Sequence, residues 1–136
     1  MDHIAMWLKT ALAVIGAAFA WVYGAWDAAI MVLLAMVAID YISGVLAAAA
    51  RKELSSRVGF IGLAKKFGIF AIVAVAALID KVVPMANGAL RAAACMFFIA
   101  NEGLSILENW AGLGLPLPDI LKKTLVQIKD KGKATE

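Results

Sequence analysis

Long apolar blocks separated by short polar segments dominate the sequence. The first two blocks, residues 5–26 and 28–50, hold one charged residue each, Lys9 and Asp40. A helix that crosses a bilayer needs about 20 mostly apolar residues, so each block is long enough to span a membrane. The segment Gly24–Asp27 between them predicts a tight turn. The pattern therefore predicts a helical hairpin.

Two weaker apolar blocks follow, residues 67–86 and 89–110. Asp80 lies in the first of them and Arg91 near the start of the second, and such charges are costly at membrane depth. Asn87 and Gly88 predict a turn between the blocks, which favours a second hairpin. A three-span arrangement, with one block lying in the membrane interface, is the alternative.

The composition indicates a membrane protein. Of the 136 residues, 64% are apolar and 17% are charged, whereas soluble domains have about 45–50% apolar and 25% charged residues. We therefore predict an all-α integral membrane protein with about four transmembrane helices, arranged as two hairpins. The single cysteine, Cys95, lies in an apolar run and is expected to be a small buried side chain. With one cysteine and one histidine, no metal site is expected.

The distribution of Lys and Arg predicts the orientation. Residues 51–66 and the tail after Pro118 hold ten of the 13 basic residues, whereas the first turn holds none. Short positive loops stay in the cytoplasm, so four spans would leave both termini cytoplasmic. A cleaved signal peptide is an alternative reading of the N-terminus, with Ala18–Ala20 as the cleavage site. The apolar core runs on through that site, which argues against cleavage.

Two segments lie outside the predicted spans. In residues 51–66, Leu54, Val58 and Ile61 have helical spacing, which suits either a surface helix or a solvated linker. We expect residues 1–118 to form the transmembrane domain and 119–136 a basic cytoplasmic tail with a short amphipathic helix. This tail is either solvated or drawn to anionic lipid. Its lysines are Lys122, Lys123, Lys129, Lys131 and Lys133.

Ionisable side chains inside membrane spans usually face a protein interior or water. Asp40 lies near the middle of its span, with Ser43 and Gly44 on the same helical face. Two interpretations stay open: these groups line an aqueous path, or they pair with one another and fix helix packing. The candidates for either role are Asp40, Ser43, Gly44, Lys66, Asp80, Arg91, Asn101, Glu102, Ser105, Glu108 and Asn109.

Catalytic motifs are missing from the sequence. It contains no GxSxG, P-loop, HExxH or dinucleotide-binding glycine motif. We therefore predict that the protein is not an enzyme, has no catalytic residues and binds no cofactor. Nucleic acid is not an expected partner.

Several of these polar positions form an ordered pattern over about residues 36–131. In this order and spacing the sequence resembles the toxin-secretion/phage-lysis holin family. The residues that carry the resemblance are Ile39–Gly44, Leu54–Ser56, Gly62, Lys65 and Lys66, Leu78–Asp80, Asn101–Ile106, Glu108 and Asn109, and Gly112–Pro118.

The resemblance implies a non-enzymatic, homo-oligomeric pore former in the bacterial cytoplasmic membrane. Its lesions would release an endolysin or a toxin and so time host lysis. The implied partners are the lipid bilayer, further copies of the chain and an endolysin, and whether an antiholin restrains it is left open. The alternatives are a small ion- or proton-coupled transporter or channel subunit, and a membrane anchor or assembly protein.

Overall fold

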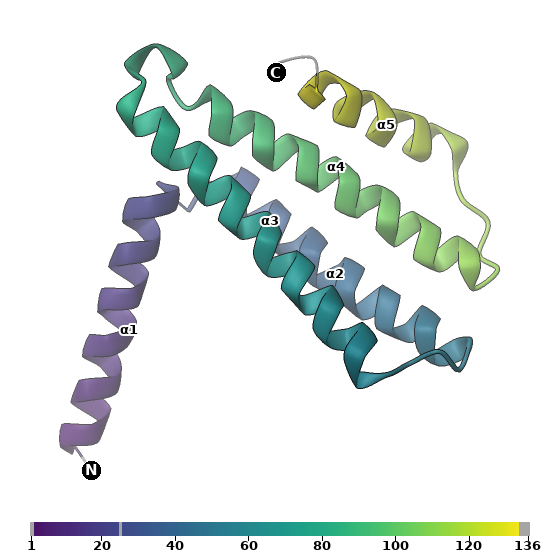
Figure 1. Cartoon of the computed structure of the whole chain (residues 1–136), viewed down its shortest axis with the longest axis horizontal. Coiled ribbons are helices and arrows are strands. Elements are labelled where there is room, and N and C mark those ends of the chain that lie inside the picture. The colour runs from purple at the N-terminus through teal and green to yellow at the C-terminus, as the bar shows by residue number, and fades with distance from the viewer. Residues whose placement is uncertain (1, 25, 134–136) are drawn as a thin grey trace.

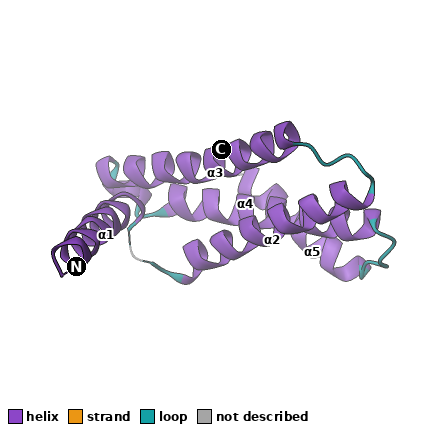
Figure 2. Ribbon diagram, turned by 90° about the horizontal axis from the view of Figure 1, so that it is seen from below, coloured by secondary structure: helices purple, strands orange, loops and turns teal. Residues whose placement is uncertain are grey.

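Helices make up almost all of the chain in the computed structural model, which describes residues 2–24 and 26–133 (Figure 1). No strand occurs in those ranges (Figure 2), so the predicted all-α fold is confirmed. Four of the helices are long and apolar enough to cross a membrane. The helices are α1 (Asp2–Tyr23), α2 (Ala28–Ala50), α3 (Ser56–Val82), the short 3₁₀ turn η1 (Pro84–Ala86), α4 (Ala89–Gly112) and α5 (Asp119–Lys133).

Local capping chemistry determines where the hairpin helices begin. The Asp27 carboxylate accepts the backbone N–H of Ile30 at 3.1 Å and caps α2. Between α3 and α4, Asn87 and Gly88 adopt left-handed backbone conformations with φ of 46° and 79°, which these two residue types tolerate best. Both turns lie where the sequence predicts them.

The third helix is longer than the predicted span. It begins at Ser56, eleven residues before the expected start at Phe67, so residues 56–66 are helical and continuous with the span, and a linker is confined to residues 51–55. Gly59 and Gly62 are helical and face Tyr41, whose hydroxyl donates to the Gly59 carbonyl at 3.5 Å. The helix ends at Val82 rather than Ala86, because Pro84 cannot continue it.

Helices α2, α3 and α4 form a bundle with a small apolar core. Cys95 is fully buried in it, as expected. Between helices in lipid, close van der Waals packing replaces the hydrophobic driving force. Fully buried Ala47 on α2 and Ala100 on α4 suit such close approach. The core consists of Ile30, Leu33, Val37, Ile69, Val73 and Cys95.

Helix α1 stands apart from this bundle at an angle (Figure 1). The C-terminal end of α1 contacts α3, where the Tyr23 hydroxyl donates to the Phe70 carbonyl at 2.8 Å. The Lys81 ammonium also lies 4.3 Å from the centroid of the Trp21 ring. None of the apolar window of α1 is buried, so nearly its whole surface is available to lipid.

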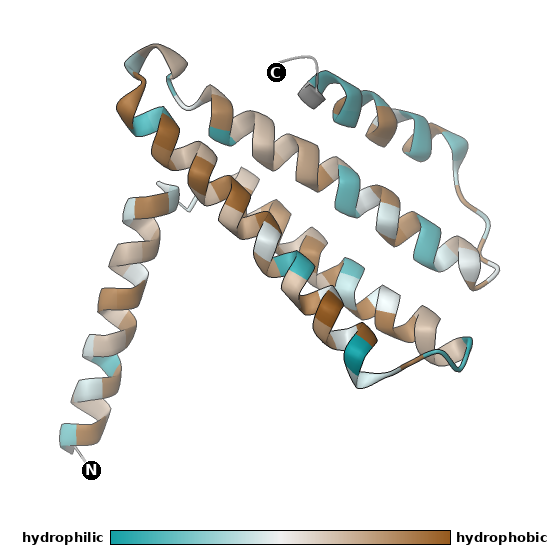
Figure 3. Ribbon diagram, in the orientation of Figure 1, coloured by the Kyte–Doolittle hydropathy of each residue, from teal (hydrophilic) through white to brown (hydrophobic). Residues whose placement is uncertain are grey.

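Helix α5 runs back along α4, on the side of α4 away from α3 (Figure 1). The contact is close: a Cβ atom added to Gly103 of α4 would lie 3.1 Å from a Leu125 methyl group. Much of α5 is hydrophilic (Figure 3). The amphipathic helix expected in the tail is present, and it packs on α4, which neither the solvated nor the lipid-bound alternative includes.

Candidate functional site

A lysine between two carboxylates links the three helices of the bundle. The Lys66 ammonium of α3 donates to the Asp40 carboxylate of α2 and to the Glu102 carboxylate of α4. The Asp40 and Glu102 side chains are 7% and 3% exposed, and that of Lys66 is 16% exposed. Buried charges are stable only when paired, so this contact holds the three helices in one register.

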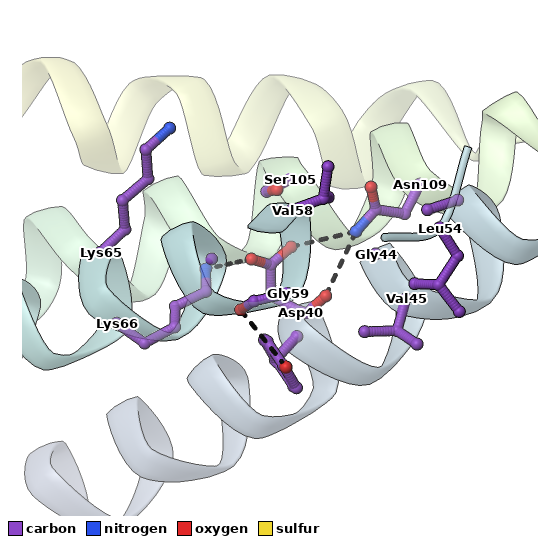
Figure 4. Close-up of a pocket in the computed structure, with 13 residues that line it drawn as sticks. Asp40, Gly44, Val45, Leu54, Val58, Gly59, Lys65, Lys66, Ser105 and Asn109 are labelled. Atoms are coloured by element: carbon purple, nitrogen blue, oxygen red, sulfur yellow. Dashed lines mark hydrogen bonds and ion pairs between the residues drawn. The ribbon is translucent and has the colours of Figure 1, made fainter. Parts of the chain in front are cut away.

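Asn109 completes the cluster from α4 (Figure 4). Its side-chain amide donates to the second Asp40 carboxylate oxygen at 3.1 Å and to the Ser43 hydroxyl at 2.9 Å. Ser43 in turn donates to the Asp40 backbone carbonyl at 3.1 Å. A Cβ atom on Gly44 would lie 3.6 Å from the Asn109 amide. We call Asp40, Ser43, Lys66, Glu102 and Asn109 the polar network.

The polar network lies at one depth. Asp40 precedes the end of α2 at Ala50 by ten residues, and Glu102 precedes the end of α4 at Gly112 by ten. Lys66 follows the start of α3 at Ser56 by ten as well. At 1.5 Å per residue these are about 15 Å, half of a hydrocarbon core about 30 Å thick. If the bundle spans a bilayer, the charges lie near its middle.

A pocket of about 290 Å³ adjoins the polar network. Asp40, Lys66, Ser105 and Asn109 supply its polar wall, and it extends to Leu54 in the loop between α2 and α3 (Figure 4). Its volume and polar groups are sufficient for several water molecules. Water could therefore reach the network from this end of the bundle.

A second charged cluster lies at the opposite end of the bundle. The Arg91 guanidinium donates to both Asp27 carboxylate oxygens at 2.8 and 3.1 Å. This contact and the Ile30 N–H lower the pKa of Asp27 to about 2. Asp80 accepts the backbone N–H groups of Leu90 and Arg91 at 3.2 and 2.8 Å. It therefore caps α4 rather than joining the polar network.

The remaining candidates are not part of the polar network. Asn101 is half-buried and Glu108 is exposed, although the sequence places them on one face with Ser105. In α5, Lys122, Lys123 and Lys131 are exposed, and the Lys129 ammonium lies 5.9 Å from the centroid of the Phe97 ring. The side chain of Lys133 lies outside the part of the chain that the structure describes.

The sequence does not mark two of the participating residues as members of a site. Asp27 lies just before an apolar block, which is a helix-capping signal, but nothing local identifies Arg91 as its partner. Tyr41 carries no sequence signal for its contact with α3, because Gly59 and Gly62 resemble linker residues. Both contacts depend on residues distant in the chain.

The apolar core separates the two charged ends. On α2, Ile30, Leu33 and Val37 lie between Asp27 and Asp40, and Cys95 lies between Arg91 and Glu102 on α4. Within the described residues, no group of three His, Cys, Asp or Glu side chains could hold a metal ion. Fold and site together define a multi-pass membrane protein with a paired polar network inside a closed bundle.

The sequence matches the bacteriophage holin family over residues 17–130. A probable holin of Bacillus phage phi105 is 42% identical over 99 residues, which cover 72% of this chain and 73% of that protein. A 14.9 kDa protein from the nagH 3′ region of Clostridium perfringens is 37% identical over 131 residues, covering 96% and 99%. YqxH of Bacillus subtilis is 38% identical over 99 residues, covering 73% and 70%. No solved structure matches.

The chain therefore belongs to the bacteriophage holin family, which confirms the resemblance inferred from the sequence. Its role is of the holin type, in a membrane that it crosses several times. Family membership favours a non-enzymatic membrane protein.

Proposed function

We propose that this protein oligomerises in the bacterial cytoplasmic membrane and forms lesions that release an endolysin or a toxin, thereby timing host lysis. Its partners are the lipid bilayer, further copies of itself and the endolysin. The observation that carries the proposal is that the helical bundle of one copy is closed. Its charges at mid-depth are paired, and an apolar core fills the bundle beyond them. A conduit must then form between copies.

The polar network has a packing role in this proposal. Lys66 and Asn109 satisfy the Asp40 carboxylate inside one copy, so Asp40 has no need of water or of a second chain. An unpaired charge at mid-membrane costs about 2.5–3.5 kcal/mol on insertion scales, which favours the closed arrangement. Assembly then uses the outer surfaces of the bundle.

The test is induced expression in a bacterium, with and without a cytosolic endolysin that lacks a signal peptide. Membrane potential and culture density are followed together. We expect abrupt depolarisation after a lag in both cultures, and lysis only where the endolysin is present. The lag reflects accumulation to the density at which copies assemble.

Two controls make the result decisive. An endolysin inactivated at its catalytic site should leave depolarisation unchanged and prevent lysis, and immunoblotting of washed membranes must show equal insertion. Cells that keep growing with their potential intact, despite that insertion, would contradict the proposal.

A second candidate function is a small ion- or proton-coupled transporter or channel subunit. The observation that favours it is the 290 Å³ pocket, which reaches the buried Asp40 carboxylate and the Lys66 ammonium that bridges it to Glu102. Such a protein would pass ions but not a folded enzyme. Depolarisation without endolysin-dependent lysis would therefore favour this candidate over the holin function.

A further inference from the structure

The packing of α5 on α4 indicates which face of the protein contacts water in a lesion. Gly103 has no side chain. A Cβ atom added to it would lie 3.1 and 3.2 Å from the two Leu125 methyl groups. A second contact places the Lys129 ammonium 5.9 Å from the Phe97 ring centroid. Two contacts four residues apart on α5 place this helix along α4.

These contacts give the depth of α5. Gly103 lies nine residues before the end of α4 at Gly112, and Phe97 lies fifteen residues before it. At 1.5 Å per residue the distances are about 14 and 22 Å. If α4 crosses a hydrocarbon core about 30 Å thick, then docked α5 reaches beyond the middle of that core.

The outer face of docked α5 is mostly polar, apart from exposed Ile120 near the start of the helix. Lys123 and Gln127 lie two residues on either side of Leu125, so they point away from α4, and both are exposed. Lys122 and Lys131 are exposed as well. Charged side chains at membrane depth face protein or a water-filled cavity rather than lipid. The docked position of α5 therefore requires water or another copy of the chain, not lipid, on its outer side.

We propose that α5, docked on α4, lines the water-filled lumen of the lesion and gives it a lysine-rich wall. This proposal rests on the proposed function, since it needs a lesion with a lumen. The apolar, nearly unburied α1 and the outer surface of α3 then face lipid and neighbouring copies. The surface between copies runs beside the α4–α5 pair, which stays intact.

A lysine-rich wall predicts an electrical property of the smallest openings. Fixed positive charge attracts anions over about one Debye length, which is about 30 Å at 0.01 M salt and 10 Å at 0.1 M. Small conductance steps in dilute KCl should therefore favour chloride over potassium. The preference should fade as salt rises or as the lesions grow wider.

The experiment uses the full-length protein in planar bilayers, with Cys95→Ala as the background and Gln127→Cys as the reporter. A water-soluble thiol reagent that adds a negative charge is applied, and the reversal potential of the smallest steps is measured in a KCl gradient. We expect the reversal potential to shift toward the potassium equilibrium potential. A reagent of the same size that adds a positive charge should shift it the opposite way.

Two matched controls separate lumen lining from general effects. Ile15 on α1 is 64% exposed, and Ile15→Cys should show no shift, because this position faces lipid. In the reporter background, Gly103→Leu should displace α5 and abolish the shift. Adding Leu125→Ala makes room for the new side chain and should restore the shift.

The outcomes are distinguishable. Reagent-dependent shifts at Gln127→Cys that disappear with Gly103→Leu and return with Leu125→Ala establish the proposal. Conductance steps without any shift at Gln127→Cys overturn it, place α5 away from the lumen, and leave the proposed function standing. If no conductance appears at any density of membrane-inserted protein, the proposed function fails and this proposal fails with it.

Discussion

At the scale of single residues, the charge balance around Lys66 distinguishes the members of the polar network. Two carboxylates share one ammonium group. Asp40 accepts from Asn109 as well as from Lys66, and Glu102 accepts from Lys66. Changing Asp40 to an amide would turn an –NH₂ group toward one of its two donors. Glu102 can become an amide and still accept from Lys66 through its remaining oxygen.

We therefore predict unequal losses of stability for two single substitutions in the network. Lys66→Met leaves two buried carboxylates without their shared cation and should destabilise the bundle by about 3–5 kcal/mol, the usual cost of removing one partner of a buried pair. Glu102→Gln leaves one lysine with one carboxylate and should cost far less. Thermal unfolding in detergent measures both, and equal losses would contradict a packing role for the network.

The ion pair at the other end predicts a dependence on pH. The pKa of Asp27 is about 2 in the folded protein, below its ordinary value of 3.8. The stabilisation is therefore present above about pH 4 and is lost as pH falls through 2. The Asp27 side chain is 46% exposed, so the effect should be at most about 1 kcal/mol. The difference in unfolding temperature between wild type and Asp27→Asn should shrink from pH 5 to pH 2, and a constant difference would refute this origin.

At the scale of elements, a side chain from α3 caps the N-terminus of α4. Gly88, the residue before α4, offers no side chain to its first N–H groups. The Asp80 carboxylate of α3 accepts two of them and also places negative charge at the positive end of the α4 dipole. The hairpin of α3 and α4 is thereby closed at its turn.

Removing this cap should loosen the hairpin. Asp80→Ala should cost about 0.5–2 kcal/mol, the range for lost helix caps, and should speed amide hydrogen exchange at Leu90 and Arg91. Asp80→Asn keeps one accepting oxygen and should have a smaller effect. Unchanged exchange at both amides in Asp80→Ala would contradict the capping role.

At the scale of the whole molecule, the bundle is polarised along its length. The polar network and its pocket lie toward the basic loop between α2 and α3, whereas the core of Ile30, Leu33 and Ile69 lies toward Asp27 and Arg91. Positive loops stay on the cytoplasmic side. Before a lesion forms, we expect both termini and the network's opening on that side of the membrane.

Reporter fusions check this orientation. A reporter active only in the cytoplasm should work after the last residue of the chain. A reporter active only outside the cytoplasm should work when inserted after Asn87. The reverse pattern at either site would contradict the four-span orientation.

The closed bundle also predicts that permeability depends steeply on protein density. In vesicles of fixed lipid composition, release of a trapped dye should be negligible at low protein-to-lipid ratio and rise above a threshold. The reason is that one copy has no open path through its apolar core. Release proportional to protein from the lowest density would show that single copies conduct.

The helical fold class, the two turns and the family follow from the sequence alone. Apolar block length and turn residues are local properties, and they survive whatever the helices pack against. It did not determine that Lys66 is helical and joins Asp40 to Glu102, that Arg91 pairs with Asp27, or that Leu125 packs on Gly103. Those contacts join residues 22 to 64 positions apart, and only the packing of whole helices brings such side chains together.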